Sequence, residues 1–150
     1  MKYSGLILND ITAAPGLCVS FFTQGCPHRC KGCHNPETWN VDGGKEFTTG
    51  TLNEIISGLT AQGIQRDLCI MGGEPLCDEN AFLTYLVTKE VKEKVPGAKI
   101  YIWSGYTYEQ LQQARHPQVK HALEIADFLI DGPYIEEERD VTLEMRGSRN

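Results

Sequence analysis

The sequence predicts a single-domain α/β protein, residues 1–150, whose mostly parallel sheet forms a partial, open (βα) barrel. Short apolar stretches alternate with amphipathic, helix-like stretches, which is the pattern of consecutive βα units. The 150 residues of the chain are an ordinary length for one domain. A closed eightfold barrel needs about 250 residues, so this chain has room for only part of one.

Four apolar stretches predict buried strands, because each is short and is bounded by glycine or polar residues. They cover residues 19–22, 68–71, 99–103 and 128–130. The segment before the first of them, residues 3–17, predicts an irregular hairpin at one edge of the sheet.

Apolar residues at helical spacing predict helices between these strands. The helical patterns cover residues 52–59, 82–91, 108–114 and 118–125. Thr49 or Thr51 is the expected N-cap of the first helix. Pro96 and Gly97 are expected to end the second one.

The composition excludes several classes of protein. The net charge is −6 and the basic residues are scattered singly, whereas a nucleic-acid surface needs clustered Lys and Arg. The apolar runs are too short to span a membrane, and the N-terminal residues lack the apolar core of a secretory signal. We therefore expect a cytoplasmic protein whose partners are small molecules or another protein.

Each predicted strand is followed at once by a segment rich in glycine and polar residues. These segments are TQGCPHRCKGCHN, GGEPLCD, SGYTYE and DGPYIEEERD. Active sites of α/β proteins form from the loops at the carboxyl ends of parallel strands. The sequence therefore predicts one site, assembled at one rim from all four segments.

Cys26, Cys30 and Cys33 lie on the first of these segments, within eight residues. In a reducing compartment such clustering favours metal or redox chemistry over disulfides. Cysteine thiolates hold iron–sulfur clusters. Three of them would leave one iron of a four-iron cubane without a protein ligand, and an open coordination position is where a substrate binds. Cys18, Cys69 and Cys77 lie apart. We expect Cys18 and Cys69 to be core residues, whereas Cys77 could lie near the rim and is not expected to be a ligand.

Other interpretations of the cysteine segment remain open. Residues 30–34 also match the C-x-x-C-H pattern of haem attachment, which requires export. His34 could complete a Cys3His zinc site, although ligands at adjacent positions 33 and 34 would strain the loop. Three inert thiols are a further alternative, which the glycine-containing polar loop disfavours.

The order of motifs resembles a known family. C-x3-C-x2-C followed by GGEP is similar to the radical S-adenosylmethionine superfamily. The segments CPHRCKGCHNPETW, MGGEPL, IWSGYTYEQL, FLIDGPYIEEERD and RGSRN, in this order, resemble the activating proteins of anaerobic ribonucleoside-triphosphate reductases. The match covers about residues 9–150.

This resemblance implies the cofactors and their ligands. Cys26, Cys30 and Cys33 would hold a [4Fe-4S] cluster, whose open iron would bind the amino and carboxylate groups of S-adenosylmethionine. The remaining contacts to S-adenosylmethionine would come from Gly32, Cys33, His34, Gly72, Gly73, Glu74 and Ser104.

The resemblance assigns these residues to different parts of S-adenosylmethionine. The GGEP segment would meet the methionine amino group, with Glu74 as an acceptor, and Ser104 with Gly105 would meet the ribose. Many superfamily members carry an aromatic residue just before the third cysteine, near the adenine. This chain has Gly32 there, so His34 or the backbone of residues 32–34 would take over that contact. Trp39 and Trp103 are expected to pack rather than to stack on the cofactor.

The resemblance also implies an activity. The protein would be an oxidoreductase that cleaves S-adenosylmethionine reductively and generates a glycyl radical on the large subunit of the reductase. A flavodoxin-like donor would supply the low-potential electron. Hydrogen-atom abstraction needs no general base, so the sequence nominates no acid–base catalyst, and His28, Glu74 and Asp131 are not assigned that role.

Rival functions remain. An activase of another glycyl-radical enzyme, such as pyruvate formate-lyase, would share the motifs, although such activases are usually longer. A radical enzyme acting on a small molecule is disfavoured by so short a barrel. A non-catalytic iron–sulfur or zinc-binding module would not need the GGEP segment. The acidic residues 136–140 are expected to form a solvated loop.

Overall fold

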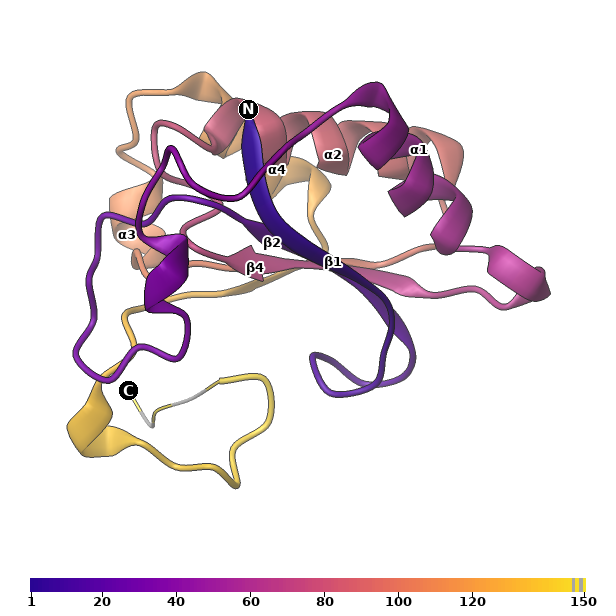
Figure 1. The fold of residues 1–150 in the computed structure, drawn as a ribbon. Coiled ribbons are helices and arrows are strands. Elements are labelled where there is room, and N and C mark those ends of the chain that lie inside the picture. The colour runs from indigo at the N-terminus through magenta and orange to yellow at the C-terminus, as the bar shows by residue number, and fades with distance from the viewer. Residues whose placement is uncertain (147, 149) are drawn as a thin grey trace.

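The computed structural model describes residues 1–146, 148 and 150. Gly147 and Arg149, both in the RGSRN segment, lie outside the described residues. The strands are β1 (Lys2–Asp10), β2 (Cys18–Thr23), β3 (Lys45–Glu46), β4 (Asp67–Gly72), β5 (Ile100–Trp103) and β6 (Phe128–Ile130). Within the described residues they form one six-stranded sheet in the order β3-β1-β2-β4-β5-β6 (Figure 1).

The helices are α1 (Thr49–Gly58), α2 (Ala81–Lys94), α3 (Tyr108–Leu111) and α4 (Pro117–Ile125), with 3-10 turns η1 (Pro36–Thr38), η2 (Ala61–Gly63) and η3 (Glu136–Glu138). β2, β4, β5 and β6 are parallel neighbours in chain order. Right-handed crossovers between sequential parallel strands place every connecting helix on the same face. Accordingly, α1, α2 and α4 all cover one face of the sheet (Figure 1).

The expected mixed α/β fold with an open sheet is confirmed, since the outer strands β3 and β6 are not neighbours. The N-terminal segment matches its prediction over most of its length. β1 pairs antiparallel with β2 through two register irregularities, as an irregular hairpin would. The two-residue β3 covers the outer side of β1 only at Lys2 and Tyr3, so the expected edge position was wrong at that end alone.

The parallel strands alternate their side chains between two apolar layers, as the pleat of a strand requires. Phe21, Ile70 and Ile102 point into the main core beneath the helices. Cys69 and Tyr101 point to the other face, where they pack with a second apolar cluster that includes Met71, Trp103 and Met145. Because these strands are buried on both faces, their sequences are mostly apolar and do not alternate between apolar and polar residues.

The three isolated cysteines are buried, as expected for Cys18 and Cys69. Cys18 and Cys69 are fully buried on the face opposite the helices, and Cys77 is 3% exposed. Burial raises the pKa of the Cys69 thiol strongly and that of the Cys77 thiol to about 12. Both side chains therefore stay protonated at neutral pH and behave as small apolar residues.

Helix boundaries differ from the expected ones where capping decides them. α3 ends at Leu111 rather than at 114. The N-cap of α1 is Thr48, not Thr49 or Thr51. Thr51 is instead the partner of Thr48 in a reciprocal capping box, since each hydroxyl accepts from the other residue's backbone N–H at 3.2 Å. Neighbouring threonines made the position of the cap ambiguous from sequence.

This correction leads to a stability prediction. Thr48→Ala removes an acceptor for an otherwise unpaired helix N–H and should lower the free energy of unfolding by about 1 kcal/mol. Thr49→Ala is the matched control, because Thr49 is exposed at the next position, and it should change stability by less than about 0.5 kcal/mol. Urea unfolding of both variants measures the difference. Equal losses would contradict the assignment of the cap.

No helix among the described residues is both long and apolar enough to cross a membrane.

Candidate functional site

A cavity of about 640 Å³ lies at the carboxyl ends of the parallel strands. Met71, Trp103 and Ile130 line it, and all three belong to the apolar cluster on the face away from the helices. The cysteine loop after β2 and the C-terminal segment after β6 lie at this same end of the sheet (purple and yellow in Figure 1). The volume falls in the range of sites for drug-sized ligands and cofactors.

The structure brings almost all of the predicted site residues to this one cavity. Its lining includes Cys26, Cys30, Cys33, His34, Gly72, Gly73, Glu74 and Ser104. The exception is Gly32, whose Cα faces the Glu136 side chain instead, so that an added Cβ would come within 2.6 Å of a carboxylate oxygen. The expected convergence of four loops on one rim is therefore found, with Gly32 on its outer side.

The cysteine loop is a tight, irregular turn. Gly25 and Gly32 have positive φ values of 101° and 76°, which supports the expectation that glycines relax this backbone. Arg29 also lies in the left-handed region, at φ 51°. The Cys33 amide donates to the Cys30 carbonyl at 3.1 Å, and the Asn35 amide donates to Cys33 Sγ at 3.4 Å. An amide that faces the sulfur suits a thiolate ligand, because hydrogen bonds to cluster sulfurs are one of the ways in which proteins adjust these groups.

The three cysteine side chains are partly buried free thiols. Burial is the main cause that raises the pKa of the Cys26 thiol, and the nearby Glu74 carboxylate adds to it. Ligation of a metal would therefore displace a proton from Cys26. Among the residues that the structure describes, no three His, Cys, Asp or Glu side chains stand at the spacing of ligands to a single metal ion. A cubane makes a different demand, because each cysteine binds a different iron.

The GGEP loop packs directly on the start of the cysteine loop. The Gly73 amide donates to the Thr23 carbonyl at 2.9 Å, and the Glu74 amide donates to the Gly25 carbonyl at 2.8 Å. A Cβ at Gly72 would lie 2.6 Å from the Thr23 nitrogen, and one at Gly73 would collide with the Gly25 oxygen. The two glycines are thus required by the approach of two backbones within the chain.

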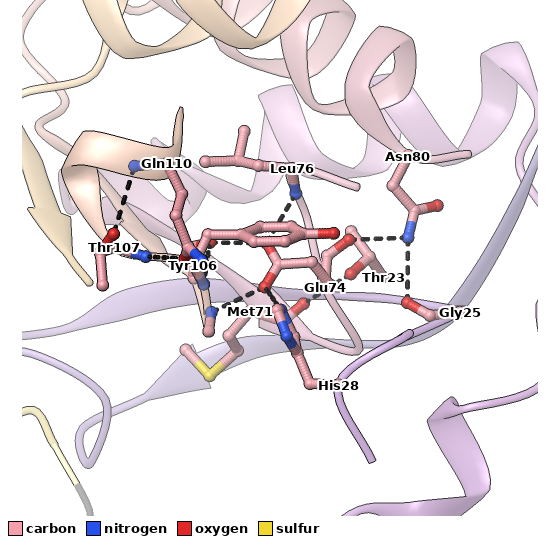
Figure 2. Close-up of polar contacts among 12 residues, drawn as sticks. Thr23, Gly25, His28, Met71, Glu74, Leu76, Asn80, Tyr106, Thr107 and Gln110 are labelled. Atoms are coloured by element: carbon pink, nitrogen blue, oxygen red, sulfur yellow. Dashed lines mark hydrogen bonds and ion pairs between the residues drawn. The ribbon is translucent and has the colours of Figure 1, made fainter. Parts of the chain in front are cut away.

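The Glu74 carboxylate is the centre of a buried hydrogen-bond network (Figure 2). Its side chain is 1% exposed, and four donors surround it. Oε1 accepts from His28 Nε2 and from the Gly105 amide, both at 2.7 Å. Oε2 accepts from the Leu76 amide at 2.9 Å and from Ser104 Oγ at 2.8 Å.

This network changes the roles expected for two residues. Glu74 was expected to accept from the amino group of a ligand, yet donors of the protein already occupy both of its oxygens. The Ser104 hydroxyl donates to Glu74 and accepts from the Tyr106 amide at 3.1 Å, so it too is engaged. Both side chains hold the loops together.

Asn80 is a structural residue that the sequence did not single out. Its buried amide nitrogen donates to the Gln24 carbonyl at 2.9 Å, the Gly25 carbonyl at 3.3 Å and the Glu74 carbonyl at 2.9 Å. Figure 2 shows it reaching across to Gly25. An Asn before an apolar helix resembles an ordinary N-cap, but this side chain makes no cap bond to α2.

The C-terminal segment supplies a wall that the sequence did not predict. Met145 and Arg146 line the cavity, and the Met145 carbonyl accepts from the Trp103 indole N–H at 2.6 Å. Tyr134 lines it as well, with its ring centroid 5.6 Å from that of His34. Tyr134 belongs to the DGPYIEEERD segment, which was predicted to reach the rim. For Met145 and Arg146 the sequence offered only the RGSRN resemblance, which carried no assigned role.

The acidic stretch 136–140 was expected to form a solvated loop, and Glu136 and Glu137 are exposed. Lys31 of the cysteine loop lies 3.9 Å from a Glu136 oxygen and 3.7 Å from a Glu137 oxygen. These pairs are exposed and contribute little energy. They nevertheless place η3 against the outside of the cysteine loop.

Both tryptophans lie at the cavity. Trp39 lines it from the cysteine side and carries the Arg29 guanidinium over its ring at 5.3 Å. Its indole nitrogen is buried without a hydrogen-bond partner among the described residues. Trp103 lines the floor at the end of β5.

Comparisons with known proteins match this arrangement. Residues 13–150 match the family model of the 4Fe-4S single cluster domain. An anaerobic ribonucleoside-triphosphate reductase-activating protein from Vibrio cholerae is 35% identical, over 100% of this chain and 95% of its own length. The protein of that name from Escherichia coli K12 is 31% identical over 100% and 96%. The one from Enterobacteria phage T4 is 35% identical over 89% and 81%.

Proposed function

The chain belongs to the family of anaerobic ribonucleoside-triphosphate reductase-activating proteins, and from that premise we propose that it is a radical S-adenosylmethionine enzyme that activates such a reductase. One observation carries the proposal. Three cysteines of one short loop line the same cavity as the GGEP and Ser104 loops, and no fourth cysteine is among its described lining residues.

The donor set fits a [4Fe-4S] cluster. Cys26, Cys30 and Cys33 offer three soft thiolates, and thiolates are the ligands that such clusters take. The Asn35 amide beside Cys33 Sγ adds a hydrogen bond of the kind found around cluster cysteines. We propose these three residues as the cluster ligands, with the fourth iron left for S-adenosylmethionine.

When bound, the reduced cluster would supply one electron to the sulfonium of S-adenosylmethionine. The C5′–S bond would then break to give methionine and a 5′-deoxyadenosyl radical, and this radical would take a hydrogen atom from a glycine of the reductase. The residues of the chain would bind the cluster and S-adenosylmethionine, orient them, and exclude water from the cavity. A flavodoxin-like protein would donate the electron.

The contacts to S-adenosylmethionine follow from which groups remain available. The backbone of Gly72 and Gly73 faces the cavity and would meet the methionine amino group, because the Glu74 carboxylate is already engaged. The backbone near Ser104 would meet the ribose. His34 and Tyr134 would face the adenine, since this chain has Gly32 at the position where many superfamily members carry an aromatic residue. Cys33, which lines the cavity where Gly32 does not, would contribute backbone at that end.

The architecture suits a protein substrate. We propose that residues 1–150 form one radical S-adenosylmethionine domain, with a sheet that is a partial (βα) barrel and helices on one face only. A partial barrel leaves its mouth open, so a glycine-bearing loop of the large reductase subunit could reach the cavity. The six free cysteines favour the reducing cytoplasm as the location.

A reconstitution experiment tests this function. Protein loaded anaerobically with iron and sulfide, then reduced with dithionite, should convert S-adenosylmethionine into equal amounts of 5′-deoxyadenosine and methionine. Addition of the large reductase subunit should produce a glycyl radical, detected by electron paramagnetic resonance. Chromatography of the products and the spin count measure the two steps separately.

The alternatives are outcomes of the same experiment. Radical formation on pyruvate formate-lyase, and none on the reductase, would identify a different activase. An iron–sulfur protein that forms no 5′-deoxyadenosine, or a tightly bound zinc ion, would contradict the enzymatic proposal and indicate a non-catalytic module.

A further inference from the structure

His28 lies between the first two cysteines, and its imidazole is turned toward the Glu74 carboxylate rather than toward solvent (Figure 2). Nε2 is 2.7 Å from Glu74 Oε1, and the two side chains are 16% and 1% exposed. The carboxylate also accepts hydrogen bonds from two backbone amides and the Ser104 hydroxyl, so we assign Nε2 as the donor in this contact.

The imidazole is held on its other sides as well. Its ring centroid lies 4.4 Å from that of Tyr106, in an edge-on arrangement. Gly105 approaches so closely that a Cβ there would lie 2.6 Å from His28 Cδ2. One polar contact and two packing contacts therefore fix the orientation of the side chain.

The backbone of this part of the loop is otherwise poorly tied. Within the described residues, no backbone hydrogen bond joins residues 27–29 to another loop. The nearest such bonds lie at the start of the loop, where Gly25 is bonded to Thr38 and to Glu74 and Cys26 is bonded to Trp39. Beyond that start, His28 provides a side-chain link from residues 27–29 to the Glu74 network.

That network already joins the other two loops of the cavity. Glu74 belongs to the GGEP loop, and Ser104 and Gly105 belong to the loop after β5. A side chain that connects the cysteine stretch to Glu74 therefore fixes where the sulfurs stand relative to both loops.

We infer that His28 is a positioning residue: its bond to Glu74 sets the placement of the Cys26–Cys30 stretch against the GGEP and Ser104 loops, and so of the cluster against S-adenosylmethionine. The inference rests on the proposed function for its catalytic consequence. It rests on the geometry alone for its effect on the loop.

Two substitutions separate this role from a general loss of structure. His28→Leu keeps an apolar side chain of moderate size and removes the donor. His28→Gln keeps an N–H donor that can reach Glu74. His121→Gln, at an exposed histidine of α4, is the matched control. All three variants retain the cysteines, so their iron and sulfide contents should equal that of the wild type.

The first measurement needs no cluster. Amide hydrogen exchange of the metal-free protein under anaerobic conditions should be faster in residues 26–33 of His28→Leu, and close to the wild type in His28→Gln and His121→Gln. Unchanged exchange in His28→Leu would overturn the inference, whatever the activity of the protein proves to be.

The second measurement uses the reconstituted protein. A displacement of about 1 Å can cost roughly 100-fold in rate, so 5′-deoxyadenosine formation by His28→Leu should fall by about that factor. His28→Gln should recover most of the rate. The spectral change of the reduced cluster on addition of S-adenosylmethionine should be altered in His28→Leu only.

The outcomes distinguish the two proposals. A wild-type protein that makes no 5′-deoxyadenosine contradicts the proposed function, while the exchange result still decides the role of His28 in the loop. An active wild type with an equally active His28→Leu variant overturns the positioning role and leaves the proposed function intact. Loss of iron from His28→Leu, in proportion to the loss of rate, would also overturn it, because His28 would then serve cluster retention.

Discussion

Replacing Cys30 by alanine should abolish both cluster binding and the cleavage of S-adenosylmethionine. Cys30 is the middle ligand of the proposed three-cysteine set and lines the cavity with the other two. With two thiolates left, a second iron would lose its protein ligand, and the cluster should not assemble stably. The 5′-deoxyadenosine signal should fall to background, and the brown absorption of the reconstituted protein should be lost.

Cys69→Ala is the matched control for this experiment. Cys69 is a fully buried thiol of β4, on the apolar face away from the helices. Its removal should cost about 1 kcal/mol of stability, with iron content and product formation unchanged. Iron and sulfide analysis, absorption spectra and product chromatography compare the two variants. A Cys30→Ala protein that keeps its cluster and its product would contradict the proposed ligand set.

Substituting Glu74 should cause the largest loss of folding stability. Its buried carboxylate accepts hydrogen bonds from His28, Leu76, Ser104 and Gly105. Glu74→Ala leaves four buried donors without an acceptor and should lower the free energy of unfolding by about 3–5 kcal/mol. That is a large part of the total of about 5–15 kcal/mol that ordinary domains have.

Glu74→Gln tests whether the acceptor character, and not only the shape, matters. Its amide nitrogen would face two donors that need an acceptor, so this variant should also lose about 2–3 kcal/mol. Glu54→Gln, at an exposed position of α1, is the control and should stay within about 0.5 kcal/mol of the wild type. Urea unfolding of the metal-free protein gives the values. A Glu74→Gln variant as stable as the control would show that the network is not held by the carboxylate.

Most of the sheet could be predicted from the sequence because its strands are buried on both faces. Val19, Phe21, Ile70 and Ile102 belong to apolar runs that end in glycine or polar residues, so their strands stood out. β3 has only two residues, both exposed, and offers no apolar pattern at all. Its pairing with β1 depends on where the chain returns in space, which no local signal records.

In the candidate site, too, some features follow from local sequence patterns and others depend on the fold. The cysteine spacing and the GGEP segment are local patterns, and the loops that carry them do meet at one cavity. Three of the four donors to Glu74 come from positions 28, 104 and 105, which are far from Glu74 in the chain, so its saturation by donors could not be read from the sequence. The wall formed by Met145 and Arg146 belongs to an irregular segment without periodicity, where sequence patterns have little to say.

The positions of the two tryptophans have an optical consequence. The chain contains two tryptophans, Trp39 and Trp103, and both line the cavity. The intrinsic indole fluorescence of the protein therefore originates entirely at the wall of that cavity. Any group that enters it changes the surroundings of every emitter at once, so emission can report occupancy in a titration, whereas unfolding is better followed by circular dichroism.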